Sequence, residues 1–257
     1  MNATLLALTP PQVMLGGVLY FALLYFGVGG LNLLLTRVVL PTLGYGRRID
    51  LRPVPPAQRR REFTLSIISI LIFGLGLIVP WGFLKLGWAQ VVEHPAWWRI
   101  ALELAVLALW NELHFYVNHR LLHTRPLRRF HVPHHRSLVT TPWSTYSFHP
   151  VEALMLGSVP LVPMLLHDFS FTALALLPFF SIVINNLGHS NYEFSRREKP
   201  RGWQGASRRH HLHHTRYHGN YGFLAAWPDR LFRSALREDE PSRASPRRPR
   251  SDAEPIA

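Results

Sequence analysis

Long apolar runs separated by polar, Arg-rich stretches dominate the pattern along the chain. Residues 13–35 contain Asn32 as their only strongly polar side chain, and residues 64–84 contain no charged residue. Each run has the roughly 20 residues that an α-helix needs to cross the hydrocarbon core of a bilayer. Both runs are therefore predicted to be transmembrane helices.

A third apolar run begins after Arg99, continues to Val117 and differs from the first two in its polar content. It carries Glu103, Asn111, Glu112 and His114. Ionisable side chains at membrane depth are energetically costly and usually face a protein interior or a functional site. We therefore expect this third helix to border such a site.

Two further apolar runs follow, a short one at residues 153–166 and a longer one at 169–187. Together they predict a helical hairpin that crosses the membrane partly or fully, kinked at Pro160, Pro163 and Pro178. The predicted fold is thus all-α, a polytopic membrane bundle of four to five spans. No positive residue precedes the first run, which is also too long for a signal-peptide core, so we expect a retained anchor.

The distribution of charge predicts how the bundle is oriented. Between the first two spans lie two acids, Asp50 and Glu62, against seven arginines: Arg37, Arg47, Arg48, Arg52, Arg59, Arg60 and Arg61. The loop at residues 85–99 is nearly neutral, so the positive-inside rule places the Arg-rich loop in the cytoplasm. Counting spans then brings residues 118–150 and 189–257, which hold 12 of the 15 histidines, to the same side. The sequence therefore predicts a cytoplasmic helical cap that carries the histidines.

Composition narrows the chemistry. The 28 Lys and Arg give a formal charge of +13, which could indicate a nucleic-acid partner. Arg-rich loops beside apolar membrane spans also explain this charge, so we expect no nucleic-acid partner. The chain has no Cys, which excludes disulfides, thiolate-bound zinc, iron–sulfur clusters and Cys-ligated haem. Three regions are predicted: a membrane span and basic loop at 1–62, a catalytic domain at 63–236, and a disordered tail at 237–257.

Three histidine clusters stand out: His119-Arg-Leu-Leu-His123, His131-Val-Pro-His134-His135 and His210-His211-Leu-His213-His214. Residues three and four apart share a helix face, and Pro133 is tolerable if its helix begins near His131. Imidazoles that share a volume repel one another when charged, whereas metal binding uses the neutral form. The eight histidines at these spacings, which leave out His211, exceed what one tetrahedral zinc accepts, so two metals fit better. Imidazole suits iron, zinc, copper and nickel alike.

Further motifs accompany these clusters. Glu112 and Tyr116 precede His119-Arg120, and an Asn-Tyr-Gly at 220–222 is followed by Trp-Pro-Asp-Arg-Leu-Phe at 227–232. Between the clusters lie Phe-His-Pro-Val-Glu at 148–152 and Gly-His-Ser-Asn at 188–191. As a set, in this order, these motifs over about residues 60–235 resemble the fatty acid hydroxylase/sterol desaturase superfamily.

The resemblance implies two iron ions, with O2 as co-substrate and zinc as a substitute that a purified or crystallised form could hold. It implies nine metal ligands: His119, His123, His131, His134, His135, His189, His210, His213 and His214. Glu193 stands where some members carry a further His, and could be an oxygen ligand or a solvated acid. We expect His149 and Glu152 to orient ligands or line the lipid entrance, and Glu112 to accept the ring N–H of a ligating His. His218 could be an extra ligand or a spectator.

The implied reaction is hydroxylation or desaturation of a lipid C–H bond, and the lipid could be fatty acyl, sphingoid, sterol-like, alkylglycerol or carotenoid. No dinucleotide-binding glycine motif or cysteine-bound cluster is present, so a separate electron donor is expected: a reductase, a ferredoxin or a cytochrome b5-like carrier. The alternatives are a membrane metal transporter, or a metal-binding protein without oxygenase activity, such as an adaptor with structural zinc sites. Transport needs ligands near mid-bilayer, whereas these clusters begin where the spans end.

Overall fold

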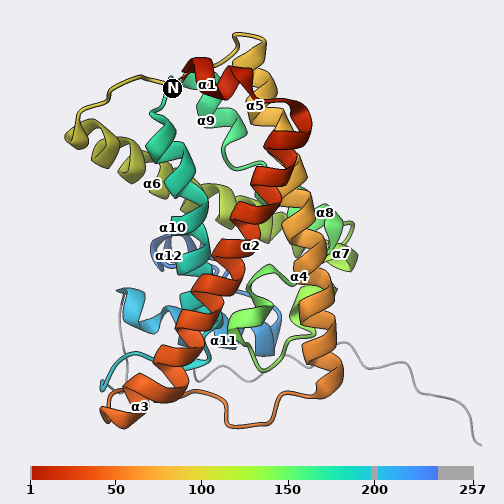
Figure 1. Ribbon diagram of the computed structural model, residues 1–257. Helices are drawn as coiled ribbons and strands as arrows, with labels where there is room; N and C mark the ends of the chain where they lie inside the picture. The colour runs from red at the N-terminus through yellow and green to blue at the C-terminus, as the bar shows by residue number, and fades with distance from the viewer. Residues whose placement is uncertain (1, 198–201, 237–257) are drawn as a thin grey trace, which may run out of the picture.

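The computed structural model describes residues 2–197 and 202–236 and is mostly helical (Figure 1). Four helical segments are long and apolar enough to cross a membrane: Pro10–Thr42, Pro56–Lys85, Trp97–Leu122 and Phe171–His189. They confirm the predicted all-α membrane bundle. The run at 153–166 forms two short helices, α8 (Pro150–Gly157) and α9 (Leu161–Leu166). The predicted tail at 237–257 lies outside the described residues.

The long segments are each built from one or more helices. The first comprises α2 (Pro10–Leu34), the π-helical turn η1 (Leu35–Val39) and α3 (Leu40–Thr42), and the second comprises α4 (Pro56–Gly76) and α5 (Ile78–Lys85). The third is α6 (Trp97–Leu122) and the fourth is α10 (Phe171–His189). The other helices are α1 (Asn2–Ala7), α7 (Arg128–His135), η2 (Pro142–Tyr146), η3 (Gly202–Gly205), α11 (Ala206–Arg216) and α12 (Trp227–Leu231).

Helices α2 and α4 run side by side (Figure 1) and touch through glycine. A Cβ atom on Gly17 would lie 2.4 Å from the carbonyl oxygen of Gly74, and a Cβ on Gly74 would lie 2.4 Å from the backbone nitrogen of Val18. Lipid chains are as apolar as Leu, so helices in a membrane gain most from close packing, which small residues permit. The two glycines therefore set the distance between the helices.

Farther along α2 and α4, the short helix η2 inserts between them. The Tyr25 hydroxyl and the Ser66 hydroxyl both donate to the backbone oxygen of Trp143, at 2.9 and 3.1 Å. Around this wedge lies the main buried apolar cluster: Phe21, Leu24, Tyr25, Ile70, Tyr146, Phe148, Ala153 and Ile182. Residues 142–146, which belong to the first predicted histidine-bearing segment (118–150), thus pack inside the bundle.

Polar side chains within the membrane-spanning helices form hydrogen bonds with other parts of the protein. Asn32 donates from Nδ2 to the backbone oxygen of Asn186 at 3.1 Å, which ties α2 to α10. Glu103 is buried in α6 and accepts the backbone N–H and the hydroxyl of Ser170, the N-cap of α10. The Nε2 atom of His114 lies 3.2 Å from the hydroxyl of Ser158. These contacts explain how an otherwise apolar bundle holds its polar residues.

A two-stranded antiparallel sheet, absent from the all-helical prediction, joins the Arg-rich loop to the segment after α10. Strand β1 (Arg47–Arg48) pairs with β2 (Tyr192–Glu193), and Asp50 exchanges hydrogen bonds with Asn191. Gly46 adopts φ +75°, and a Cβ there would lie 2.4 Å from the backbone oxygen of Glu193. The loop therefore rests against the chain only a few residues beyond His189.

Helix α7 begins at Arg128, three residues before the start expected from Pro133. A turn leads into it, because the N–H of Arg128 donates to the carbonyl of Thr124 at 2.9 Å. Pro133 thus lies inside the helix, where it removes one backbone hydrogen bond. The helix ends two residues later at His135, so it is short enough to tolerate that loss.

Replacing Gly74 by Ala should destabilise the protein by about 1–3 kcal/mol, because the new methyl group overlaps α2 backbone. The matched control is Gly76→Ala, where no atom lies within 4 Å of the added Cβ and the higher helix propensity of Ala is neutral or favourable. Thermal unfolding in detergent measures both variants. Equal melting temperatures would contradict the assignment of Gly74 as the close contact.

Candidate metal centre

Nine histidines lie together in two neighbouring groups whose ligand atoms are within 4.8 Å of one another. The five-histidine group contains His119, His123, His131, His135 and His213. The four-histidine group contains His134, His189, His210 and His214. The groups adjoin, with the rings of His135 and His214 stacked at 4.7 Å between centroids. The structure thus brings together the nine histidines to which the sequence assigned a ligand role.

The histidines come from the ends of two long helices and from two short ones. His119 and His123 lie at the C-terminal end of α6, and His189 is the last residue of α10. In α7, His131 and His135 belong to the five-histidine group and His134 belongs to the four-histidine group. Helix α11 has the opposite arrangement: His210 and His214 belong to the four-histidine group and His213 to the five-histidine group.

This division follows from helix geometry. At about 100° per residue, the fourth neighbour is rotated about 40° to one side of the starting residue and the third neighbour about 60° to the other side. A cluster with spacing i, i+3, i+4 therefore aims two imidazoles at one centre and the remaining one at the adjacent centre. Two such helices supply six of the nine rings.

The separations between ring nitrogens match those of ligands on one ion. In the five-histidine group Nε2 of His131 lies 3.1 Å from Nε2 of His119 and 3.0 Å from Nε2 of His135. In the four-histidine group Nε2 of His210 lies 3.1 Å from both Nε2 of His189 and Nε2 of His214. Imidazole nitrogens that bind one metal at about 2.0–2.1 Å, at right angles, are about 3 Å apart.

Hydrogen bonds fix the tautomer of several rings. The Nδ1 atoms of His119, His189 and His213 donate to the backbone carbonyls of Tyr221, Asn185 and Gly219, at 2.9, 2.9 and 2.7 Å. Because a carbonyl only accepts, Nδ1 carries the proton and Nε2 of the neutral ring keeps a lone pair. For His213 this Nε2 is buried and has no hydrogen-bond partner, which is the state of a metal ligand.

Burial holds these rings in the neutral form that metals bind. Burial, together with the neighbouring His119 ring, lowers the pKa of His123 to about 2. Burial also lowers the pKa values of His134 and His213 well below their usual range, with nearby histidines adding to the effect. Protonation of these rings is therefore unfavourable, so a proton shared between two rings would not replace a metal cation in this site. The set of nitrogen donors fits two metal ions bound by imidazole.

Two carboxylates support the site in different ways. Glu152, at the start of α8, is buried, and its Oε1 lies 2.7 Å from Nδ1 of His131, as expected of a residue that orients a ligand. The expectation that Glu112 holds a histidine ring is wrong. Its carboxylate accepts the backbone N–H groups of Leu224 and Ala225, at 3.2 Å each. Glu112 thereby fixes the loop that carries Tyr221, whose backbone carbonyl accepts the Nδ1 hydrogen of His119. Glu112 thus supports His119 indirectly.

The remaining candidates lie outside both groups. Glu193 is 3% exposed, which contradicts the solvated alternative, and its Oε2 lies 3.5 Å from a guanidinium nitrogen of Arg208. His149 caps α8, where its Nδ1 accepts the N–H of Val151 at 3.2 Å. Nδ1 of His218 donates to the backbone oxygen of Arg216 at 2.8 Å. None of the three belongs to a described histidine group.

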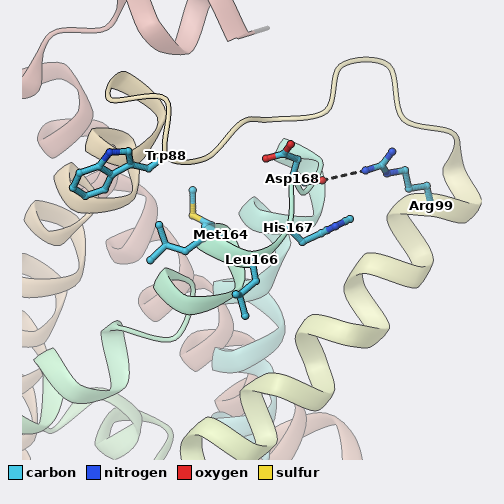
Figure 2. Close-up of a pocket in the computed structure, with 7 residues that line it drawn as sticks. Trp88, Arg99, Met164, Leu166, His167 and Asp168 are labelled. Carbon is cyan, nitrogen blue, oxygen red and sulfur yellow. Dashed lines mark hydrogen bonds between the residues drawn. The ribbon is translucent and has the colours of Figure 1, made fainter.

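A separate cavity of about 380 Å³ contains none of the nine histidines (Figure 2). Its lining residues are Trp88, Arg99, Met164, Leu165, Leu166, His167 and Asp168. Arg99 donates to the backbone oxygen of Asp168 at 3.1 Å, shown as the dashed line, and to Glu103 at 2.9 Å. The bond to Asp168 joins the start of α6 to the α9–α10 connection, and the bond to Glu103 lies within α6. We therefore assign a structural role to the polar residues there.

Sequence reasoning missed the backbone carbonyls that orient the rings, because a carbonyl belongs to every residue and leaves no signal in the sequence. It also missed Tyr217, whose ring contacts His123 and His135 at centroid distances of 4.8 and 4.6 Å. The signal for Tyr217 was its position three residues after His214.

Comparison with known proteins agrees with this geometry. A Delta(7)-sterol 5(6)-desaturase from Candida glabrata is 31% identical over 195 residues, which cover 71% of this chain and 51% of the relative. The enzyme of that name from Saccharomyces cerevisiae is 30% identical with the same coverage. A methylsterol monooxygenase from Aspergillus fumigatus is 29% identical over 156 residues, 56% of this chain and 51% of the relative. The chain thus spans about half the length of these relatives. No solved structure matches it.

A family model described as fatty acid hydroxylase matches residues 104–234. The matched region is about half of the chain and contains all nine histidines of the two groups. On this basis the chain belongs to the fatty acid hydroxylase family.

Proposed function

We propose that the protein is a membrane oxidoreductase that uses O2 to hydroxylate or desaturate a C–H bond of a lipid, with two iron ions held by the nine histidines. The observation that carries the proposal is the pair of adjoining groups of buried imidazoles, with a lone pair of His213 aimed at the centre and otherwise unpartnered. Neutral rings at these separations fit metal ions, and two ions fit the count of nine.

Iron is favoured over zinc because the reaction named for the relatives is an oxidation, and zinc has no redox chemistry. Iron bound there would supply the activation of O2 and the oxidation of carbon. The chain's own part is to hold the ligands and keep the site dry. Glu152 and three backbone carbonyls orient rings, while buried Leu122, Phe148 and Phe223 supply apolar surface.

The substrate class that the relatives favour is a sterol or a sterol-like polycyclic lipid. A lipid would reach the site sideways from the bilayer, along the apolar helices of residues 150–189. Metal transport is not favoured, because His119, His123 and His189 lie at the ends of α6 and α10 rather than midway along them.

The histidine groups are proposed to face the cytoplasm, together with the Arg-rich loop that β1 and β2 bring beside them. A separate reductase or small electron carrier would supply two electrons per turnover. An acidic carrier would be attracted to this basic face, because opposite charges accelerate encounter.

Metal analysis of the purified protein tests the two-metal proposal. We expect about two metal ions per chain, falling to about one in His134→Ala and in His213→Ala, since each variant removes a ligand from a different group. The control is His211→Ala, because His211 lies on the same helix but in neither group. Full metal content in both ligand variants would contradict the assignment.

Lipid analysis tests the oxidation. A host that makes sterols and expresses the wild-type chain with an electron donor should accumulate a desaturated or hydroxylated sterol. In His134→Ala the product should fall about 100-fold or more, because loss of a ligand should exceed the 10–100-fold effect of losing a group that supports one. Sterol profiles that are the same with and without the wild-type chain would count against the sterol assignment.

Single cysteines test the orientation, since the natural chain contains none. Leu51 and Leu86 are 76% and 63% exposed and lie in the Arg-rich loop and just after α5. In intact cells a membrane-impermeant maleimide should label Leu86→Cys, and it should label Leu51→Cys only after permeabilisation. The reverse pattern would place the histidine groups on the outer side.

A further inference from the structure

The short helix α12 exposes large apolar side chains on one face. Trp227, Leu231 and Phe232 are 41%, 65% and 47% exposed. Trp227 and Leu231 are four positions apart and so share a helix face, and Phe232 follows directly after the helix. The opposite face, with Pro228 and Asp229, is buried. Exposed apolar side chains gathered in this way indicate a surface that contacts a membrane or another protein.

Positive charge accompanies these apolar side chains. Arg230 and Arg233 are exposed. Asp229, the acid of this helix, is buried, and its carboxylate accepts the backbone N–H groups of Tyr221 and Gly222 at 2.8 and 2.7 Å. The exposed charges of the helix and the two residues after it are therefore all positive. Trp, Phe and Leu together with Arg are typical of segments that lie in a membrane interface.

The apolar face of α12 adjoins the membrane-spanning helix α6. The ring of Phe232 stacks on that of Tyr116 with 5.2 Å between centroids, and the guanidinium of Arg120 lies 5.8 Å from the centre of the Phe232 ring. Beside Tyr116 on α6, Leu113 and Val117 are 37% and 46% exposed, on a helix long and apolar enough to cross a membrane. The apolar face of α12 therefore continues the surface that α6 presents to lipid.

The length of α6 gives the depth of this contact. Trp97 and Trp98, at the start of α6, are 81% and 59% exposed and indicate one membrane interface, where Trp is enriched. At 1.5 Å per residue, Tyr116 lies about 27 Å farther along the helix, whereas the hydrocarbon core is about 30 Å thick. Phe232, stacked on Tyr116, thus lies at the edge of the core, and any tilt of α6 would place it deeper. Figure 1 agrees, because α12 lies farther than α11 from the end of the molecule formed by α3.

A bilayer fits this surface better than a protein does. A second copy of the chain, meeting this face through a two-fold axis, would bring arginines of the same charge together, which is unfavourable. A soluble protein would have to displace lipid in order to reach apolar side chains at the edge of the core. An acidic phospholipid offers acyl chains to the apolar side chains and a negative headgroup to the arginines.

We propose that residues 227–233 form an interfacial anchor, whose apolar side chains lie among acyl chains and whose two exposed arginines bind the headgroups of acidic phospholipids. The anchor is joined to the histidine site, because Asp229 holds the N–H of Tyr221, and the carbonyl of Tyr221 accepts the Nδ1 hydrogen of His119. The membrane surface thereby supports a loop that orients a ring of the five-histidine group. The anchor requires neither bound metal nor the proposed reaction.

A nitroxide label tests the position of the anchor. The natural chain has no Cys, so the full-length protein with Leu231→Cys takes up a single label and is reconstituted in nanodiscs of phosphatidylcholine and phosphatidylglycerol. Oxygen, which concentrates in the bilayer, should collide with this label more often than a water-soluble nickel chelate does. Labels on Leu109→Cys in α6 and Leu51→Cys in the Arg-rich loop are the references for lipid and water, since these residues are 61% and 76% exposed.

Three results are distinguishable in this experiment. Greater exposure to oxygen than to the nickel chelate, as for Leu109→Cys, supports the anchor. Exposure to the chelate equal to that of Leu51→Cys would overturn it. Protection from both reagents would overturn it as well, because it would show that protein covers the surface. If Leu231→Cys does not fold, Trp227→Cys takes its place and should give the same result.

Fluorescence quenching tests the headgroup. A bimane fluorophore on Leu231→Cys is quenched by neighbouring lipids that carry brominated acyl chains, and brominated phosphatidylglycerol is compared with brominated phosphatidylcholine in equal amounts. Phosphatidylglycerol should be preferred at this position by about fivefold or more, as expected of an arginine close to an acidic membrane surface. In Arg230→Gln/Arg233→Gln the preference should approach one.

The matched control is Arg47→Gln/Arg48→Gln, which removes the same charge from the exposed strand β1 and should leave the preference unchanged. Equal quenching by the two lipids with both anchor arginines present would overturn the binding of acidic headgroups. An undiminished preference in Arg230→Gln/Arg233→Gln would overturn the assignment of these two arginines.

Discussion

The structure depends on one electrostatic constraint: nine imidazoles share a small volume from which water is largely excluded. Protonated rings would repel one another and lack solvation, so each ring must be neutral and must have its ring nitrogens satisfied. Backbone carbonyls and Glu152 satisfy some Nδ1 atoms, and the inward-facing nitrogens are placed where they could bind metal. The long helices supply a rigid frame, because α6 and α10 end at this volume. The short helices α7 and α11 then each serve both centres.

Much of this could be predicted from the sequence because the signals are local. Uncharged runs of about 20 residues specify spans almost by length alone, and histidines three and four apart specify a shared helix face. The order of the clusters, with the motifs at 220–222 and 227–232, carried the family resemblance. Even the polar residues of the third span were informative, because Glu112 does support the site, although through a loop rather than through a histidine.

What could not be predicted depends on contacts between distant residues. Nothing in the sequence near Arg47 indicates that it pairs with Glu193, since two-residue strands have no periodicity to detect. Helix spacing divides each cluster between two directions, but which histidines of α7 and α11 share a group depends on how the two helices are rotated relative to each other, and this is set by packing. The buried course of residues 137–148 was also hidden, because Ser and Thr there resemble a surface loop in composition. In the structure their polar groups meet α4 and α10, as where Thr141 donates to Glu62 and Asn185 donates to the carbonyl of Thr145.

The wedge formed by η2 has a consequence for how the protein is made. Helices α2 and α4 emerge from the ribosome and can pair through Gly17 and Gly74 while residues 142–146 have yet to be synthesised. Their glycine contact can form at once, but the space that Trp143 and Tyr146 later fill must stay open or reopen. Biogenesis therefore has two stages. Helices α2 and α4 first pair at their glycine contact and remain apart farther along. They then close around residues 142–146, which are synthesised soon after the second histidine cluster. Completion of the membrane core is in this way coupled to assembly of the histidine site.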